Sequence, residues 1–360
     1  MPEKTLLFNI SAYSLAHALV DAACAAVLFA IVSPARSDPQ SLFQFILIYD
    51  VIAFATQPVF GLLVDQSKTP PQAAALGILL VAASTLMLGM PLLAVVTAGI
   101  GNAVFHVAGG RASLELAPGK AFLPGVFVAP GALGLTIGIM VGKSGGFTAW
   151  PFFILLLALA VVILIIPRPA ALPIPSLPAN LRWFEAVILL LLLSVAIRSL
   201  VGQSLILPWK SDPSLLLALT WSVVLGKGLG GILADRYGWV TVAVSGLVIS
   251  LPMLAFFTPV PALVILGTFL FNLSMPVTLV CLAGMLPGKS AFAFGLTALA
   301  LIIGALPAFM PLHALTGEPG FIFIAILVSI AALYGGLRLY QRHFHAPGPP
   351  LQRETQFTKK

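Results

Sequence analysis

The chain has 360 residues, of which 60% are hydrophobic and only 8% are charged, and its mean hydropathy is +1.09. In soluble globular domains about a quarter of the residues are charged. The composition of this chain therefore excludes a soluble globular domain and predicts an integral membrane protein. The formal net charge of +7 would suggest nucleic acid in a soluble chain, but basic residues collect in the cytoplasmic loops of membrane proteins, and we expect no nucleic-acid partner.

Twelve apolar segments follow one another along the chain. A helix needs ~20 apolar residues to cross a bilayer, so these segments leave short loops and no room for a soluble catalytic domain. The first segment is too long for a signal-peptide core, and we expect it to remain as the first crossing. The predicted limits are 8 to 33, 41 to 64, 72 to 91, 93 to 116, 121 to 143, 147 to 167, 184 to 208, 214 to 234, 239 to 257, 261 to 285, 291 to 312 and 319 to 337.

The second six crossings repeat the first six at a constant offset in residue number, which we call the repeat offset. It is the offset that takes Gly61 to Gly231 and Asp65 to Asp235. Further matches at the same offset are Asn102 with Asn272, Ala121-Phe122 with Ala291-Phe292, Gly125 with Gly295, and Gly134 with Gly304. Internal repeats of this kind are typical of secondary transporters.

We therefore predict an all-α membrane protein of two pseudo-symmetric six-helix halves. The expected domains are an N-terminal half over 1–167, a proline-rich cytoplasmic linker over 168–183, a C-terminal half over 184–345 and a disordered cytoplasmic tail over 346–360. The linker cannot be helical along its length because proline recurs in it.

Basic residues predict the orientation of the chain. If the N-terminus is cytoplasmic, only Arg36, Lys143 and Lys210 lie on the opposite side of the membrane, and the other loop and tail cations lie inside. This asymmetry favours two cytoplasmic termini and an even number of crossings. We expect a multi-pass protein of the bacterial cytoplasmic (inner) membrane.

Several motifs resemble those of the major facilitator superfamily, most closely its fosmidomycin-resistance-like efflux branch. Gly61-x-x-x-Asp65 and Gly231-x-x-x-Asp235-Arg236 look like the loop motif of the superfamily, and Gly125 to Gly134, with Pro130-Gly131, is similar to its antiporter motif. Closer to the branch are His17-x-x-x-Asp21, Gln57-Pro58-x-x-Gly61, Gly101 to His106, Arg198-Ser199 and Leu207-Pro208. The resemblance implies proton-driven export of a small organic compound.

His17 and Asp21 are the candidates for proton coupling. They lie four residues apart and so share one face of the first helix. A charged group at the centre of a bilayer costs ~2.5 to 3.5 kcal/mol even on lenient scales, which makes an ionisable residue there a functional hypothesis. The alternative is a pair that only fixes helix packing.

Candidates for substrate binding lie on the second and eighth crossings. Asp50, Gln57 and Gly61 are spaced by seven and four, which predicts one stripe of the second helix. Gln57 corresponds to Lys227 in the repeat, and both are expected to face one central cavity. The alternative for Lys227 is a side chain that reaches the membrane surface.

Three polar positions and one arginine complete the predicted substrate site. Asn102 and His106 are four apart on the fourth crossing, and Asn272 repeats Asn102. Arg198 lies in the middle of the seventh crossing, about as deep as Asp21 in the first. We expect Arg198 either to pair with Asp21 or to hold an anionic group of the substrate.

The expected gating residues fall into two groups. Asp65, Asp235 and Arg236, with Gly61 and Gly231, are predicted to hold the cytoplasmic side closed. Pro130, Gly131 and Gly134 are predicted to let the fifth helix bend and slide, with a purely structural kink as the alternative.

The function predicted from these residues is secondary active transport by alternating access, as proton-coupled export (antiport) of a small organic compound. The cations Arg198 and Lys227 favour an anionic one. The alternatives are a proton-coupled importer or symporter, a facilitator, and a receptor or assembly factor that does not transport. No enzymatic motif is present, and we expect no enzyme activity, no cofactor and no metal site. The expected partners are a small-molecule substrate, protons and the lipid bilayer, with the protein a monomer.

Overall fold

All regular secondary structure in the described part of the chain is helical. The computed structural model describes residues 3–31, 39–67, 69–167, 181–310 and 313–344. Within these ranges nine helices are long and apolar enough to cross a membrane, and the three shorter apolar helices Pro70–Thr85, Ala149–Ile165 and Ser290–Ala305 complete twelve crossings. The predicted all-α fold is thus confirmed. Most of the predicted linker, at 168–180, and all of the tail at 346–360 lie outside the described residues.

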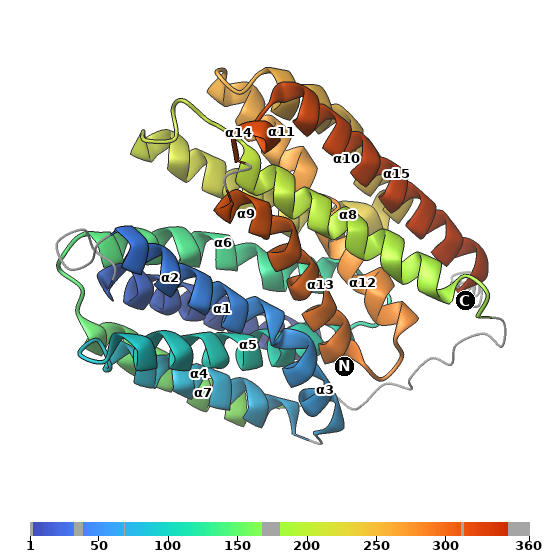
Figure 1. Cartoon of the computed structure of the whole chain (residues 1–360). Coiled ribbons are helices and arrows are strands. Elements are labelled where there is room, and N and C mark those ends of the chain that lie inside the picture. Colours follow the sequence, from blue (N-terminus) through green and yellow to red (C-terminus); the bar gives the residue numbers. More distant parts are fainter. Residues whose placement is uncertain (1–2, 32–38, 68, 168–180, 311–312, 345–360) are drawn as a thin grey trace, which may run out of the picture.

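The crossings form two six-helix halves, the N half in blue to green and the C half in yellow-green to red (Figure 1). The N half contains α1 (Glu3–Ile31), α2 (Pro39–Asp50), η1 (Val51–Ala55), α3 (Gln57–Gln66), α4 (Pro70–Thr85), α5 (Pro91–Glu115), α6 (Phe122–Lys143) and α7 (Ala149–Ile165). The C half contains α8 (Phe184–Ser204), α9 (Pro213–Tyr237), α10 (Trp239–Phe256), α11 (Pro261–Asn272), α12 (Met275–Met285), α13 (Ser290–Ala305), η2 (Leu306–Phe309), α14 (His313–Thr316) and α15 (Pro319–His343).

Prolines and one aspartate define where helices begin. Proline stands at the start of α4, α5, α9, α11 and α15, where its missing N–H is not needed. Asp212 precedes α9 and accepts hydrogen bonds from the backbone N–H groups of Ser214 and Leu215 and from the Ser214 hydroxyl. These bonds, that of the Ser214 side chain foremost, lower the pKa of Asp212 below its usual value.

Glycines allow α6 to lie directly against α1. A methyl group added at Gly134 would overlap the carbonyl of Ala18, and one at Gly138 would overlap that of Ala22. Close backbone approach at small residues is a main source of stability between membrane helices, because the bilayer removes the hydrophobic driving force. The packing therefore fixes α6 beside the polar residues of α1.

Two matching contacts join the halves at one end of the molecule, which we call the terminal face because α1 begins and α15 ends there. Asp65 accepts hydrogen bonds from the N–H groups of Ala291 and Phe292 at the start of α13, at 3.0 and 2.9 Å. Asp235 accepts the equivalent bonds from Ala121 and Phe122 at the start of α6, both at 3.0 Å. We call each of these contacts a latch. Helix N-termini carry partial positive charge and bind anions, so both carboxylates are well placed.

Gly61 and Gly231 bring the helices of each latch together. A methyl group at Gly61 would come within 2.7 Å of the Ala291 carbonyl oxygen, and one at Gly231 would overlap the Ala121 carbonyl. Further inside, Phe294 of α13 lies against Gly110 of α5, where an added methyl group would collide with its ring. The halves are therefore closely packed at the terminal face.

The second crossing is not one continuous α-helix. The π-helical turn η1 separates Asp50 from Gln57, and a π turn advances fewer degrees per residue than an α turn. The prediction that Asp50, Gln57 and Gly61 share one stripe assumed a regular α-helix. Because the π turn interrupts the helix, Asp50 does not lie on the same stripe as Gln57 and Gly61. Gln57 is fully buried, whereas Asp50 is partly exposed.

Candidate functional site

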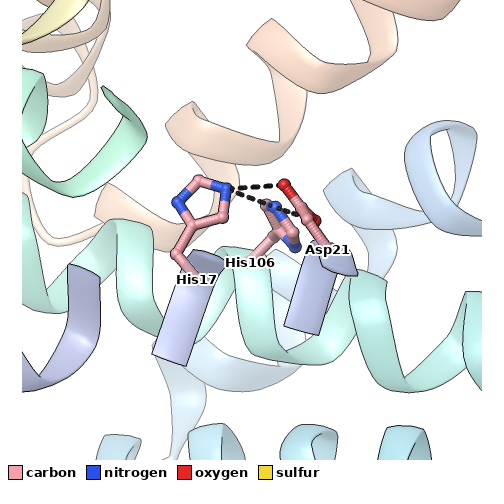
Figure 2. A group of neighbouring side chains, drawn as sticks. All are labelled: His17, Asp21 and His106. Atoms are coloured by element: carbon pink, nitrogen blue, oxygen red, sulfur yellow. Dashed lines mark hydrogen bonds and ion pairs between the residues drawn. The ribbon is translucent and has the colours of Figure 1, made fainter. Parts of the chain in front are cut away.

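Three ionisable side chains meet inside the N half (Figure 2). His17 and Asp21 come from α1 and His106 from α5, and we call them the His–Asp–His cluster. Nε2 of His17 lies 3.2 Å from Oδ2 of Asp21, and Nε2 of His106 lies 3.5 Å from Oδ1. The two Nε2 atoms are 2.9 Å apart. The cluster is thus close enough for every member to exchange a proton with the others.

The backbone fixes which ring nitrogens of the cluster carry hydrogen. Nδ1 of His17 lies 2.8 Å from the carbonyl oxygen of Phe127, and Nδ1 of His106 lies 2.9 Å from that of Asn102. A carbonyl can only accept a hydrogen bond, so both Nδ1 atoms must donate. In a neutral ring the remaining Nε2 is then a bare lone pair.

The contact between the two Nε2 atoms therefore requires a cation. Two lone pairs at 2.9 Å repel each other, whereas one proton between them makes a hydrogen bond. With that proton the imidazole pair carries one positive charge, which the Asp21 carboxylate balances. The geometry of His17, Asp21 and His106 thus favours a cluster that holds one extra proton and is neutral overall.

The surroundings of Asp21 orient it and leave it accessible. Asn102 donates from Nδ2 to Oδ1 of Asp21 at 3.1 Å. Gly131 of α6 covers Oδ2, where an added methyl group would lie 2.6 Å away. The Asp21 side chain keeps 19% of its surface exposed, while both histidines are buried. Asp21 is therefore the member through which the cluster can reach water.

The cluster is also the only group of His, Cys, Asp and Glu residues in the described ranges that could hold a metal ion, with all ligand atoms within 4.8 Å of one another. The two Nε2 atoms, however, lie only 2.9 Å apart, a hydrogen-bond distance that suits a shared proton. We treat the proton as the occupant and make the metal ion an outcome to be tested.

A separate cavity lies inside the C half. Its volume is about 150 Å³, and the polar residues that line it are Arg198, Ser199, Lys227, Asn272, Thr278 and Thr297. Arg198 is buried and donates from Nε to the Ser194 carbonyl, from Nη1 to the Ser274 hydroxyl and from Nη2 to the Thr278 hydroxyl at 3.0 Å. Ser274 lies in the break between α11 and α12, so the break holds the guanidinium in place.

Arg198 and Lys227 have no acidic partner among the described residues. No ion pair in that part of the chain involves either of them, and Asp21 contacts His17, His106 and Asn102 instead. The predicted pair of Arg198 with Asp21 is therefore not formed. The other prediction for Arg198, contact with an anionic group, stays open.

The remaining predicted residues occupy different places. His106 belongs to the cluster and Asn102 donates a hydrogen bond to it, whereas Asn272 lines the cavity of the C half. Gln57 does not line that cavity; its Nε2 donates to the Ala53 carbonyl and its Oε1 has no partner. Arg236 is exposed over the Tyr237 ring, and within the described residues no hydrogen bond or ion pair joins it to the N half. Pro130 lies inside α6, one residue before Gly131.

Sequence reasoning did not assign two features of these sites. The hydroxyls that hold Arg198 belong to Ser274 and Thr278. Their spacing of four residues could have indicated that both lie on one helix face and bind the same side chain. The contact of His106 with His17 joins α1 to α5, and nothing local in the sequence specifies it.

Comparisons with known proteins bear on the fold. No protein-family model and no curated protein matches the chain. A solved structure of a variant of the fucose:proton symporter FucP of E. coli is similar with a TM-score of 0.65 and 15% identity, covering 92% of this chain and 98% of the other. FucP in the outward conformation, described as a major facilitator superfamily transporter, is similar with a TM-score of 0.63 and 14% identity, covering 91% of this chain and 99% of the other. A bacterial homologue of the iron transporter ferroportin in an outward-facing state is similar with a TM-score of 0.58 and 15% identity, covering 93% of this chain and 98% of the other.

Twelve apolar crossings in two repeated halves, with ionisable groups inside, define a multi-pass integral membrane protein. Its fold is that of the major facilitator superfamily, as the three structures, each nearly covered by this chain, show. At this identity the likeness establishes the fold alone.

Proposed function

We propose that the chain is a secondary active transporter that couples the movement of a small organic compound to protons. The observation that carries the proposal is the His–Asp–His cluster, in which the contact of His17 with His106 needs a bound proton. Ionisable groups inside a membrane are expensive and mark proton relays. Asp21 accepts and releases the proton toward water, and His17 and His106 store it.

Alternating access supplies the mechanism, and the latches support it. In the described state Asp65 and Asp235 join the halves at the terminal face. If the termini are cytoplasmic, as the basic residues predict, this state is closed to the cytoplasm and faces outward. Breaking both latches lets the halves rock and opens the terminal face.

Export by proton antiport is the direction that the sequence resemblance to the fosmidomycin-resistance-like branch implies. Proton symport, which brings the compound in, is the second candidate, because one proton site can serve either direction. The proposed setting is the bacterial cytoplasmic membrane. A protein that only binds a ligand and does not transport would use the cavity but not the cluster.

Everted membrane vesicles with an acid interior test the proposal. Succinate, methylphosphonate, ethidium and fucose are added in turn while a fluorescent dye reports internal pH. We expect one compound to release protons from vesicles with the wild-type chain, and none from vesicles with Asp21→Asn. For symport, the same compounds are added to right-side-out vesicles, whose medium should become alkaline.

Asp212→Asn is the matched control, because Asp212 is an exposed acid that caps α9, and asparagine also caps helices. It should behave as the wild type. Equal proton release by wild type and Asp21→Asn would overturn the role of Asp21. If only MnCl₂ or ZnCl₂ elicits a response and EDTA abolishes it, the cluster holds a metal ion and the proton proposal fails.

A further inference from the structure

The C half has a cavity at the place where the N half has the His–Asp–His cluster. Gly134 of α6 faces the Ala18 carbonyl of α1, and Gly304 of α13 faces the Ala196 carbonyl of α8 in the same way. The two glycines are separated by the repeat offset, and the two alanines by a slightly larger one. Counted from these alanines, the counterpart of Asp21 is Ser199, and that of His17 is Val195.

A second contact supports the same correspondence. Asp21 lies against Gly131, and Ser199 donates its hydroxyl to the carbonyl of Leu301, which is the match of Gly131 at the repeat offset. On α5 and on the interrupted α11 and α12, Asn102 and His106 correspond to Asn272 and Pro276. The C half thus replaces two imidazoles and a carboxylate by valine, proline and serine.

These replacements empty the site and remove its negative charge. Val195, Ser199 and Asn272 line the cavity of about 150 Å³, which two cations, Arg198 and Lys227, also line. The acidic residues of the described C half all lie at helix ends, at Glu185, Asp212, Asp235 and Glu318. Arg198 is buried and Lys227 is partly buried. Cations inside a membrane are costly without a partner, so this site is suited to an anion from outside.

We propose that this cavity binds the oxyanion group, a carboxylate or a phosphonate or phosphate, of a small organic substrate. The Ser194 carbonyl and the hydroxyls of Ser274 and Thr278 use three of the five Arg198 N–H groups, which leaves two for the ligand. A planar guanidinium can bind an oxyanion through two bonds, and Lys227 adds a point charge. The volume of about 150 Å³ can accept an oxyanion group of this size.

The proposal rests on the proposed transport function only in calling the bound anion a substrate, because anion binding can be measured without transport. Purified full-length protein in detergent micelles is titrated with sodium acetate, succinate, phosphate and methylphosphonate at constant ionic strength, with fucose as a neutral compound. Thermal unfolding and calorimetry report binding. We expect at least one anion to raise the Tm of the wild type in a saturable way, and fucose to leave it unchanged.

Two variants and a control test which residues bind. Lys227→Gln introduces the residue that the N half has at the equivalent position, Gln57, and Arg198→Lys keeps the charge but loses the planar fork. Each should weaken anion binding at least tenfold. Lys210→Gln, which removes a cation outside the cavity, should bind as the wild type. Lys227→Gln keeps the test valid if Arg198→Lys does not fold.

The outcomes separate this proposal from the proposed function. If no anion binds the wild type, or if all three variants bind equally, the cavity is not an oxyanion site. Proton-coupled movement of a neutral compound without anion binding contradicts the anion site and leaves the proton-coupled transporter standing. Saturable anion binding without any proton-coupled flux supports the anion site and contradicts the proton-coupled transporter.

Discussion

At the scale of single residues, Gly131 decides whether the cluster can form. It lies where α6 covers His17 and Asp21, and an added methyl group would collide with Nε2 of His17. The identity of this residue is therefore tied to the proton site as well as to helix packing.

Gly131→Ala should disrupt the cluster. We expect it to destabilise the protein by ~1–3 kcal/mol, the usual cost of an added methylene in a packed interior, and to abolish proton coupling in the vesicle assay. Gly202→Ala is the control, since an added methyl group meets nothing within 4 Å there. Proton coupling that survives Gly131→Ala unchanged would contradict the cluster as the coupling site.

The sequence could bring together two of the three members of the cluster. Helical spacing places His17 and Asp21 on one face whatever the rest of the chain does, but His106 joins them only because α5 packs beside α1. The pair of Arg198 with Asp21, one of two predicted roles, was plausible by depth but is not formed in this state, in which Arg198 donates to Ser274 and Thr278. Depth in the membrane places a residue along the membrane normal, but it does not tell which helices lie beside that residue in the membrane plane.

At the scale of elements, the two latches are predictable and the π turn is not. The repeat offset pairs Asp65 with Asp235 and Ala121 with Ala291, so one latch between the halves implies the other. The turn η1 packs its Ile52 side chain against Gly99 of α5. The spacing of apolar residues does not report the backbone hydrogen-bond pattern, so the hydrophobic period gave no sign of the bulge.

Removing both carboxylates should open the terminal face. Asp65→Ala and Asp235→Ala each leave two partly buried N–H groups without their acceptor, at up to ~1–3 kcal/mol for each unpaired group. Spin labels on the exposed, equivalent positions Gln66 and Arg236 should report longer separations in the double variant than in either single one. Glu115→Ala, which removes an acid bonded only to Arg111 of its own helix, is the control. Unchanged distances in the double variant would mean that the latches do not hold this state.

At the scale of the whole molecule, the halves should associate without a covalent connection. Their contact depends on backbone approach at glycines, as at Gly125, where an added methyl group would lie 2.7 Å from the Lys227 carbonyl oxygen. Fragments 1–174 and 175–360, co-expressed with a tag on one of them, should therefore copurify. Gly125→Leu should reduce the yield of the untagged fragment, and Gly202→Leu should not. Equal yields with both substitutions would contradict the glycine-mediated interface.

The position of Lys227 has a consequence for thermodynamic linkage. Lys227 interacts electrostatically with Asp21 and His106, and Cys24 and Tyr49 are further titratable groups near Asp21. A proton on the cluster cancels one negative charge near this lysine, so an anion beside Lys227 binds more tightly when the cluster is protonated. By reciprocity the anion strengthens proton binding equally. A positive coupling of this kind makes the two ligands travel together, which favours symport for an anionic cargo, whereas antiport needs ligands that displace each other.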